Sequence, residues 1–142
     1  MEIECHSVEE TQNFASKFSK TIKIGSIISL NGNLGAGKTT FAQGFARGMG
    51  VKQPVGSPTF KLVSEYYGET MKLFHVDCYR LNGIDDFLNM GGENLLLHEN
   101  GVCLFEWANI IEGLLPNKTI IIDFIRFKDN SSKRLIKISG IV

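Results

Sequence analysis

The sequence predicts an α/β domain with a mixed parallel and antiparallel sheet and few helices. A short apolar run at 25–30 is followed by a glycine-rich loop and an amphipathic helix, the order of a parallel strand–loop–helix unit. Pairs of strand-like runs flank turn residues at 68–70 and 128–132, as in antiparallel hairpins. The 142 residues contain no repeat or linker-like stretch, so we expect residues 1–142 to form one domain.

The N-terminal part is predicted to hold one helix and one buried strand. Ser7 followed by Glu10 resembles a capping box, and the apolar spacing after it predicts a helix over 7–20. The run at 25–30 is short, apolar and partly β-branched, which is typical of a strand covered on both faces.

A second helix follows the glycine-rich loop. Apolar residues recur at helical spacing over 41–49, and Gly50 is placed to end the helix. Gly44 and Gly48 each weaken this helix by about 1 kcal/mol relative to alanine. Close packing against another element is the compensation that we expect for them.

The second half is predicted to be mostly strand. A short helix over 84–90 is expected to end at Gly91 and Gly92. The predicted strands are 60–67, 71–77, 101–107, 118–127 and 133–139. Together these elements predict a sheet that is parallel near the loop and antiparallel at its margins.

Composition excludes several classes of function. Lys plus Arg equals Asp plus Glu at 15 each, so we expect no DNA binding and no tight binding of RNA by the chain alone. No run approaches the length of a membrane helix, and the acidic N-terminus lacks a signal-peptide core. The three cysteines are far apart without a C-x-x-C pair, so a reducing cytoplasm is the expected location.

The stretch "NGNLGAGKTT" at 31–40 carries the chemistry. It fits the pattern G-x-x-x-x-G-K-S/T between a predicted strand and a predicted helix, the context in which that pattern binds phosphates. Lys38 is then placed for the β- and γ-phosphates of a nucleotide, and Thr39 for Mg²⁺. The alternative is a glycine-rich turn with a chance Lys-Thr pair. The strand–loop–helix order favours a P-loop NTPase domain over that alternative.

Asp77 and Glu106 are the candidate acidic partners of this loop. Each ends an apolar run, and the carboxyl ends of central strands are where such sheets place their ligands. Thr59, in "GSPTF", is a candidate for sensing the γ-phosphate through Mg²⁺, as switch segments do. The alternatives are strand-end residues that cap a loop and, for Thr59, an ordinary Ser-Pro turn.

Other polar groups carry weaker predictions. His75 and Asp77 share one face of their strand and Cys78 faces the other, which disfavours a metal triad. Trp107 is expected to serve packing more than ligand stacking. The cationic segment 126–137 is typical of a solvated hairpin face, and the alternative is that it reaches nucleotide phosphates or an RNA-bearing partner.

Four segments together resemble one family, TsaE, the small bacterial ATPase of tRNA threonylcarbamoyladenosine biosynthesis. They are "GNLGAGKTTFAQGFARGMG", "SPTFKLVSEY", "HVDCYRL" and "EWANIIEGLLP", and they span most of the chain in the order of the family. The loop alone is unspecific, whereas its combination with S-P-T-F, H-x-D-x-Y-R-L and E-W is specific.

The resemblance implies a P-loop fold, the cofactors ATP and Mg²⁺, and a set of site residues. Lys38, Asp77 and Thr59 are implied in catalysis, and Thr39 and Glu106 as Mg²⁺ ligands. The implied cofactor-binding residues are Leu34, Gly35, Ala36, Gly37, Lys38, Thr39, Thr40 and, with Ser7 in the region that approaches the adenine, Thr11. The implied partners are the TsaD and TsaB proteins, whose turnover ATP hydrolysis supports, with tRNA reached only through their complex.

The sequence departs from the family pattern at several positions, and three rival functions are open. Asn33 stands where many relatives have aspartate, which removes a negative charge near the phosphates. A regulatory GTPase would need N-K-x-D, and Ile120 replaces that aspartate in "NKTI". The other rivals are a small-molecule P-loop kinase, for which no arginine-rich lid is evident, and a nucleotide-dependent scaffold that does not hydrolyse its ligand.

Overall fold

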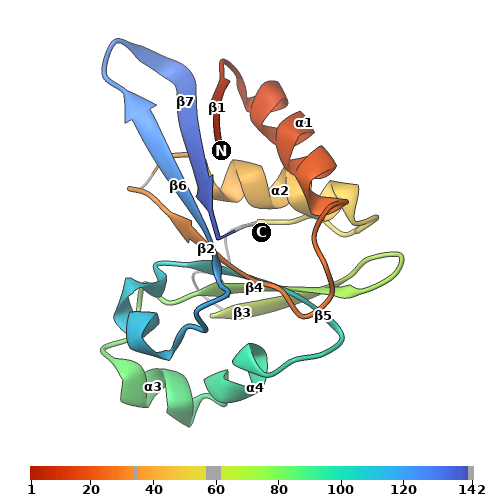
Figure 1. Ribbon diagram of the computed structural model, residues 1–142, viewed down its shortest axis with the longest axis vertical. Helices are drawn as coiled ribbons and strands as arrows, with labels where there is room; N and C mark the ends of the chain where they lie inside the picture. Colours follow the sequence, from red (N-terminus) through yellow and green to blue (C-terminus); the bar gives the residue numbers. More distant parts are fainter. Residues whose placement is uncertain (34, 57–61, 141–142) are drawn as a thin grey trace.

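A single mixed sheet organises the chain in this computed structural model, which describes residues 1–33, 35–56 and 62–140. Within these residues the strand order is β1-β7-β6-β2-β5-β4-β3 (Figure 1). The strands are β1 Glu2–Cys5, β2 Ile27–Asn31, β3 Val63–Tyr67, β4 Lys72–Asp77, β5 Gly101–Glu106, β6 Ile120–Phe127 and β7 Asn130–Ser139. The helices are α1 Val8–Ser19, α2 Lys38–Gly48, α3 Ile84–Asn89, α4 Gly92–Leu96 and the 3-10 helix η1 Ala108–Leu114.

The sheet is parallel at its centre and antiparallel at both margins, as the sequence predicted. Strand β2 pairs in parallel with β5 and β6, and β4 pairs in parallel with β5. The hairpin β3–β4 forms one margin, and β6, β7 and β1 form the other. The strand that leads into the glycine-rich loop, β2, therefore lies in the parallel centre.

Successive residues of the central strands enter two different cores. Ile28 and Leu30 of β2 belong to a core with Phe41 and Phe45 of α2, whereas Ile27 belongs to a second core with Phe87 of α3. Figure 1 shows α1 and α2 together on one side of the molecule and α3 and α4 together on the other. Both faces of β2 are therefore covered, which explains its continuous apolar sequence.

The first two helices are in backbone contact through glycines of α2. A Cβ at Gly44 would lie 2.5 Å from the Cα of Gln12, and one at Gly48 would lie 2.8 Å from the Cα of Ser16. No side chain larger than hydrogen fits there unless the helices separate. The prediction that close packing compensates for these glycines is confirmed.

Several local signals at element ends also hold in the structure, whereas β7 begins at Asn130, inside the turn predicted at 128–132. The Ser7 side chain caps α1 by accepting a hydrogen bond from the N–H of Glu10 at 3.1 Å. In the predicted turn at 68–70, the N–H of Gly68 donates to the carbonyl oxygen of Met71 at 3.0 Å. Gly50, just beyond α2, has φ 86°, the left-handed conformation expected after a helix.

Three short elements were not predicted. Strand β1 exists because it pairs with β7, which starts 130 residues along the chain. Gly91 ends α3 as predicted, but Gly92 begins the further helix α4, because Gly91 at φ 83° turns the chain and serves as its N-cap. The 3-10 helix η1 follows Trp107, where the sequence showed no helical spacing.

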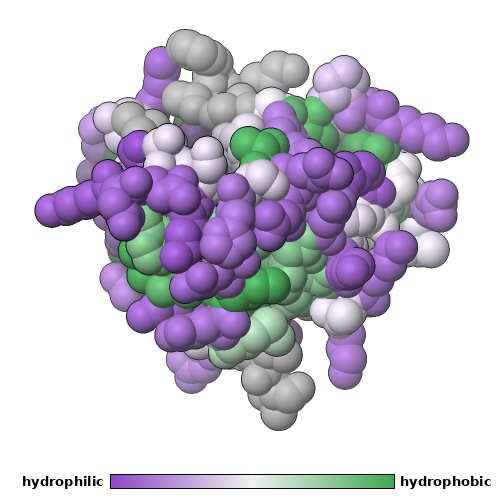
Figure 2. Space-filling view, turned by 90° about the horizontal axis from the view of Figure 1, so that it is seen from above, coloured by the Kyte–Doolittle hydropathy of each residue, from purple (hydrophilic) through white to green (hydrophobic). Residues whose placement is uncertain are grey.

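One face of the molecule is covered mostly by hydrophilic side chains, with hydrophobic ones visible between them (Figure 2). None of the helices in the described residues has the length and apolar character needed to cross a membrane.

Candidate functional site

The loop between β2 and α2 is shaped by two glycines in the left-handed region. Gly35 has φ 77° and Gly37 has φ 109°, values that residues with a side chain rarely adopt. Gly37 is also the N-cap of α2, and no side chain of a described residue caps that helix end. The first N–H groups of α2 and the positive end of its dipole therefore face the loop without a competing side chain, as an anion site requires.

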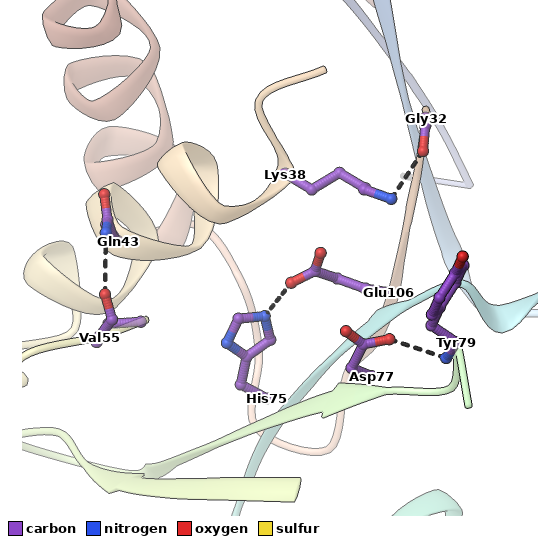
Figure 3. Close-up of polar contacts among 8 residues, drawn as sticks. All are labelled: Gly32, Lys38, Gln43, Val55, His75, Asp77, Tyr79 and Glu106. Atoms are coloured by element: carbon purple, nitrogen blue, oxygen red, sulfur yellow. Dashed lines mark hydrogen bonds and ion pairs between the residues drawn. The ribbon is translucent and has the colours of Figure 1, made fainter. Parts of the chain in front are cut away.

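Lys38, the first residue of α2, points along the loop and is buried. Its side-chain Nζ donates to the carbonyl oxygen of Gly32 at 2.7 Å (Figure 3), and only 5% of the residue is exposed. Burial lowers the pKa of the Lys38 ammonium, and the nearby carboxylates of Glu106 and Asp77 oppose that shift. Their opposition shows that the lysine and both acidic residues belong to one electrostatic cluster.

Asp77 and Glu106 are neighbours at the carboxyl ends of two parallel strands. They are direct register partners at the ends of β4 and β5, and each is 3% exposed. The Oδ1 of Asp77 accepts a hydrogen bond from the backbone N–H of Tyr79 at 2.8 Å. The structure thus brings both predicted carboxylates to the loop, while the roles assigned to each stay predictions.

His75 contacts Glu106, a contact that sequence reasoning missed. Its Nε2 lies 2.5 Å from Oε2 of Glu106, and the imidazole is fully buried (Figure 3). The sequence analysis considered His75 only with Asp77 and Cys78 on its own strand, whereas its partner lies on the neighbouring strand β5. The available signal was the position of His75 two residues before Asp77, on the same face of β4.

Trp107 lies over the predicted catalytic lysine. The Nζ of Lys38 is 3.7 Å from the centroid of the indole ring. The ring centroids of Trp107 and Tyr79 are 5.1 Å apart. Trp107 has φ 58°, an unusual backbone conformation for a residue with a bulky side chain. The expectation that Trp107 serves packing holds in part, because its packing partner is the site lysine itself.

A cavity of about 560 Å³ lies between the loop and the β6–β7 hairpin. Its lining comes from the loop and from the β6–β7 hairpin, and consists of Gly32, Asn33, Ala36, Phe124, Ile125, Arg126, Phe127, Lys128 and Ser131. Two of the cationic residues of the segment 126–137 therefore face a space beside the phosphate-binding loop. The same cavity is lined by Asn33, the residue that stands where the family resemblance leads one to expect aspartate.

The remaining predicted residues have different outcomes. Leu34 and Thr59 lie outside the described residues. Thr39 and Thr40 are half-buried in the first turn of α2. Thr11 is 2% exposed and hydrogen-bonds the thiol of Cys5, so its approach to adenine stays a prediction.

A metal held by protein alone is not indicated in the described part of the chain. No group of three or more His, Cys, Asp or Glu side chains there is arranged to hold an ion. Mg²⁺ differs from most metals because it is commonly held by one or two carboxylates, waters and substrate phosphates. The two carboxylates beside the loop fit that shared mode of binding.

Known proteins match the chain over most of its length. Residues 5–136 match the family described as threonylcarbamoyl adenosine biosynthesis protein TsaE. The tRNA threonylcarbamoyladenosine biosynthesis protein TsaE of Bacillus subtilis is 41% identical over 122 residues, 86% of this chain and 75% of that protein. The TsaE protein of Treponema pallidum is 35% identical over 116 residues, 82% of this chain and 84% of that protein.

A solved structure agrees with the sequence comparisons. The crystal structure of Bacillus subtilis YdiB superposes with a TM-score of 0.77 at 35% identity, and covers 96% of this chain and 82% of YdiB. Fold, loop and motifs point in the same direction. The chain therefore belongs to the TsaE family of tRNA threonylcarbamoyladenosine biosynthesis proteins, as its four motifs predicted.

Proposed function

We propose that the chain is a Mg²⁺-dependent ATPase that supports tRNA threonylcarbamoyladenosine biosynthesis. The observation that carries this proposal is the meeting of Lys38, Asp77 and Glu106 at the end of the parallel strands, beside an uncapped helix N-terminus. Cation, carboxylates and backbone N–H groups are the parts that phosphoryl transfer requires at one place.

Lys38 supplies the cation at the β- and γ-phosphates. An ammonium has three N–H donors, and the Gly32 carbonyl accepts from Lys38 Nζ at 2.7 Å. The carboxylates of Glu106 and Asp77, both buried, act on the same ammonium electrostatically. Two carboxylates and one ammonium sum to a net charge of −1, which favours binding of a cation beside the carboxylates.

Glu106 and Thr39 are proposed to hold Mg²⁺, and Asp77 to orient a water or a metal-bound water. Mg²⁺, when bound, would offset the charge that develops on the phosphate oxygens. The Nε2 of His75 lies 2.5 Å from Oε2 of Glu106, and this contact fixes that carboxylate oxygen in place. Asp77 is fixed in turn by the N–H of Tyr79 at 2.8 Å.

The chain lacks the aspartate with which a regulatory GTPase recognises guanine. The position at which a GTPase would need aspartate is Ile120, which begins β6 and is 8% exposed. A buried isoleucine side chain has no acceptor for the guanine N–H groups. ATP is therefore the proposed nucleotide, and a regulatory GTPase is not.

The proposed partners are TsaD-like and TsaB-like proteins, with tRNA contacted through their complex in the cytoplasm. The net charge of zero supports this indirect route, because a chain that binds tRNA alone would need surplus positive charge. Tight, salt-sensitive tRNA binding by the purified chain would contradict it.

The test compares Lys38→Ala with wild type. MgATP binding and phosphate release are measured with and without purified TsaD and TsaB, with GTP as competitor and without any phosphate acceptor. Lys52→Ala, at an exposed lysine after α2, is the control for loss of one positive charge. We expect Lys38→Ala to lose most binding or hydrolysis and Lys52→Ala to retain both.

Each alternative gives a different result in the same assay. Unchanged MgATP binding and hydrolysis in Lys38→Ala would refute the nucleotide site. Binding without phosphate release, even with both partners, would favour the non-hydrolysing scaffold. Phosphate release only with a small-molecule acceptor would favour a kinase.

A further inference from the structure

Arg134, on the C-terminal strand β7, is hydrogen-bonded to the phosphate-binding loop. Its Nε donates to the carbonyl oxygen of Ala36 and its Nη2 to that of Gly35, both at 3.0 Å. Its Nη1 donates to the carbonyl oxygens of Ser131 and Lys133, at 2.5 and 2.9 Å. One planar guanidinium thus joins the loop to the β6–β7 hairpin through all three of its nitrogens.

These contacts fix the direction of the loop peptides. In a planar trans peptide the C=O and the following N–H point in opposite directions. Because the carbonyls of Gly35 and Ala36 face Arg134, the N–H groups of Ala36 and Gly37 face away from it. The N–H of Ala36 donates to the carbonyl oxygen of Asn33 at 3.0 Å, which tightens the loop. The N–H of Gly37, the N-cap residue of α2, thus lies on the side of the loop opposite the guanidinium.

Arg126 provides a contrast within the same hairpin. It is the direct register partner of Arg134, and its Nη1 lies 3.4 Å from the position that a Cβ on Gly35 would occupy. Like charges directly opposite on a strand pair are unfavourable, and the charge of Arg126, after burial, lowers the pKa of Arg134. Arg126 is exposed, and none of the described residues accepts a hydrogen bond from it. Both arginines bring positive charge to the loop, but only Arg134 holds its backbone.

We infer that Arg134 is a positioning residue of the nucleotide site, which sets the loop so that the N–H of Gly37 and the first N–H groups of α2 meet the phosphates. This inference rests on the nucleotide binding proposed above. It assigns to the C-terminal hairpin a part in ligand binding that the motifs of the family do not include. Arg134 acts through the loop backbone and makes no contact with the phosphates itself.

The test uses Arg134→Ala, Arg134→Lys and the matched control Arg126→Ala, with Lys38→Ala as reference. The dissociation constant for MgADP is measured by calorimetry at 0.15 M salt, well below the melting temperature of each variant. We expect Arg134→Ala to bind about tenfold more weakly, since a hydrogen bond to a charged group is worth at least that factor. Arg134→Lys keeps the positive charge but not the planar guanidinium that bonds two loop carbonyls. It should therefore recover only a small part of the MgADP affinity that Arg134→Ala loses. Arg126→Ala removes a charge beside the loop but no hydrogen bond to the loop backbone, so it should weaken binding less than Arg134→Ala does.

A spectroscopic signature separates positioning from general destabilisation. At saturating MgADP, the backbone amide proton of Gly37 should move downfield in wild type and in Arg126→Ala as it bonds to a phosphate. The same shift should shrink in Arg134→Ala and in Arg134→Lys, even when each is saturated. If Arg134→Ala does not fold, the Gly37 shift is measured in Arg134→Lys alone.

The outcomes distinguish this inference from the proposal on which it rests. If Lys38→Ala weakens binding while Arg134→Ala and Arg134→Lys bind like wild type with the full Gly37 shift, the positioning role is wrong. Full recovery by Arg134→Lys would overturn it too, because charge alone would then suffice. If Lys38→Ala binds MgADP like wild type, the nucleotide site itself is refuted.

Discussion

The contact between α1 and α2 makes Gly44→Ala a sharp test of how the helix behind the loop is held. Ordinarily, alanine in a helix interior is favoured over glycine by about 1 kcal/mol. At this position a Cβ would lie 2.5 Å from the Cα of Gln12, about 1 Å closer than ordinary van der Waals contact. The atom in the way is backbone, which cannot rotate aside as a side chain does.

For Gly44→Ala, the free-energy cost of the steric clash should exceed the gain from the higher helix propensity of alanine. Overpacking a tight contact costs about 1–3 kcal/mol, and a backbone obstacle places this site in the upper part of that range. After subtraction of the propensity gain, we expect the free energy of unfolding to fall by about 1–2 kcal/mol. For a domain of this size that corresponds to a melting temperature lower by roughly 3–6 °C.

Urea and thermal unfolding followed by circular dichroism measure both quantities. Gly113→Ala is the matched control, because Gly113 lies in η1 with nothing within 4 Å of the added Cβ. That variant should be neutral or stabilised by up to about 1 kcal/mol, since it restricts the unfolded chain. If Gly44→Ala proves as stable as wild type, the backbone contact is not limiting and the reasoning fails.

Three further predictions concern the site and the buried thiols. Glu106→Ala should raise the Mg²⁺ concentration needed for ATP hydrolysis, whereas Asp77→Ala should lower kcat and retain more MgATP affinity; an unchanged Mg²⁺ titration for Glu106→Ala would refute its metal role. His75→Ala leaves the buried Glu106 carboxylate without its partner at 2.5 Å, so urea unfolding should show a loss of about 1–3 kcal/mol, and wild-type stability would mean that the pair contributes nothing. Burial raises the pKa of Cys78 and of Cys103 to about 12, so a thiol reagent at pH 8 should label them only after unfolding, and rapid labelling of the native chain would contradict this.

The fold was predictable where the signals are local. Ser7 and Glu10 stand at a helix start, and the strand, glycine loop and helix at 25–50 follow one another without interruption. Strand β1 was not predictable in this way, because Glu2 becomes a strand residue by pairing with Lys137 at the far end of the chain. Its four residues carry too short a pattern to show alternation.

The site was predictable up to the point at which strand register becomes necessary. Asp77 and Glu106 each end an apolar run, and parallel strands bring such ends together whatever their exact alignment. Alternation along β4 places His75 on the same face as Asp77, but its contact with Glu106 also depends on how β4 and β5 are aligned. The Arg134 contact likewise needs the β6–β7 hairpin to fold back beside a loop about 100 positions earlier, a separation of 98 residues from Ala36.

Lys38 and Glu106, the lysine and one carboxylate of the proposed site, already have partners among the described residues, and this determines what nucleotide binding must accomplish. The Lys38 ammonium donates to the Gly32 carbonyl and lies over Trp107, and the Glu106 carboxylate contacts His75. These partners hold the groups in place, so little side-chain entropy is lost when phosphates arrive. For Lys38, however, a phosphate oxygen must add to or replace a carbonyl and an aromatic ring. The measured affinity therefore reports a difference between two sets of contacts, and Lys38→Ala removes both sets at once.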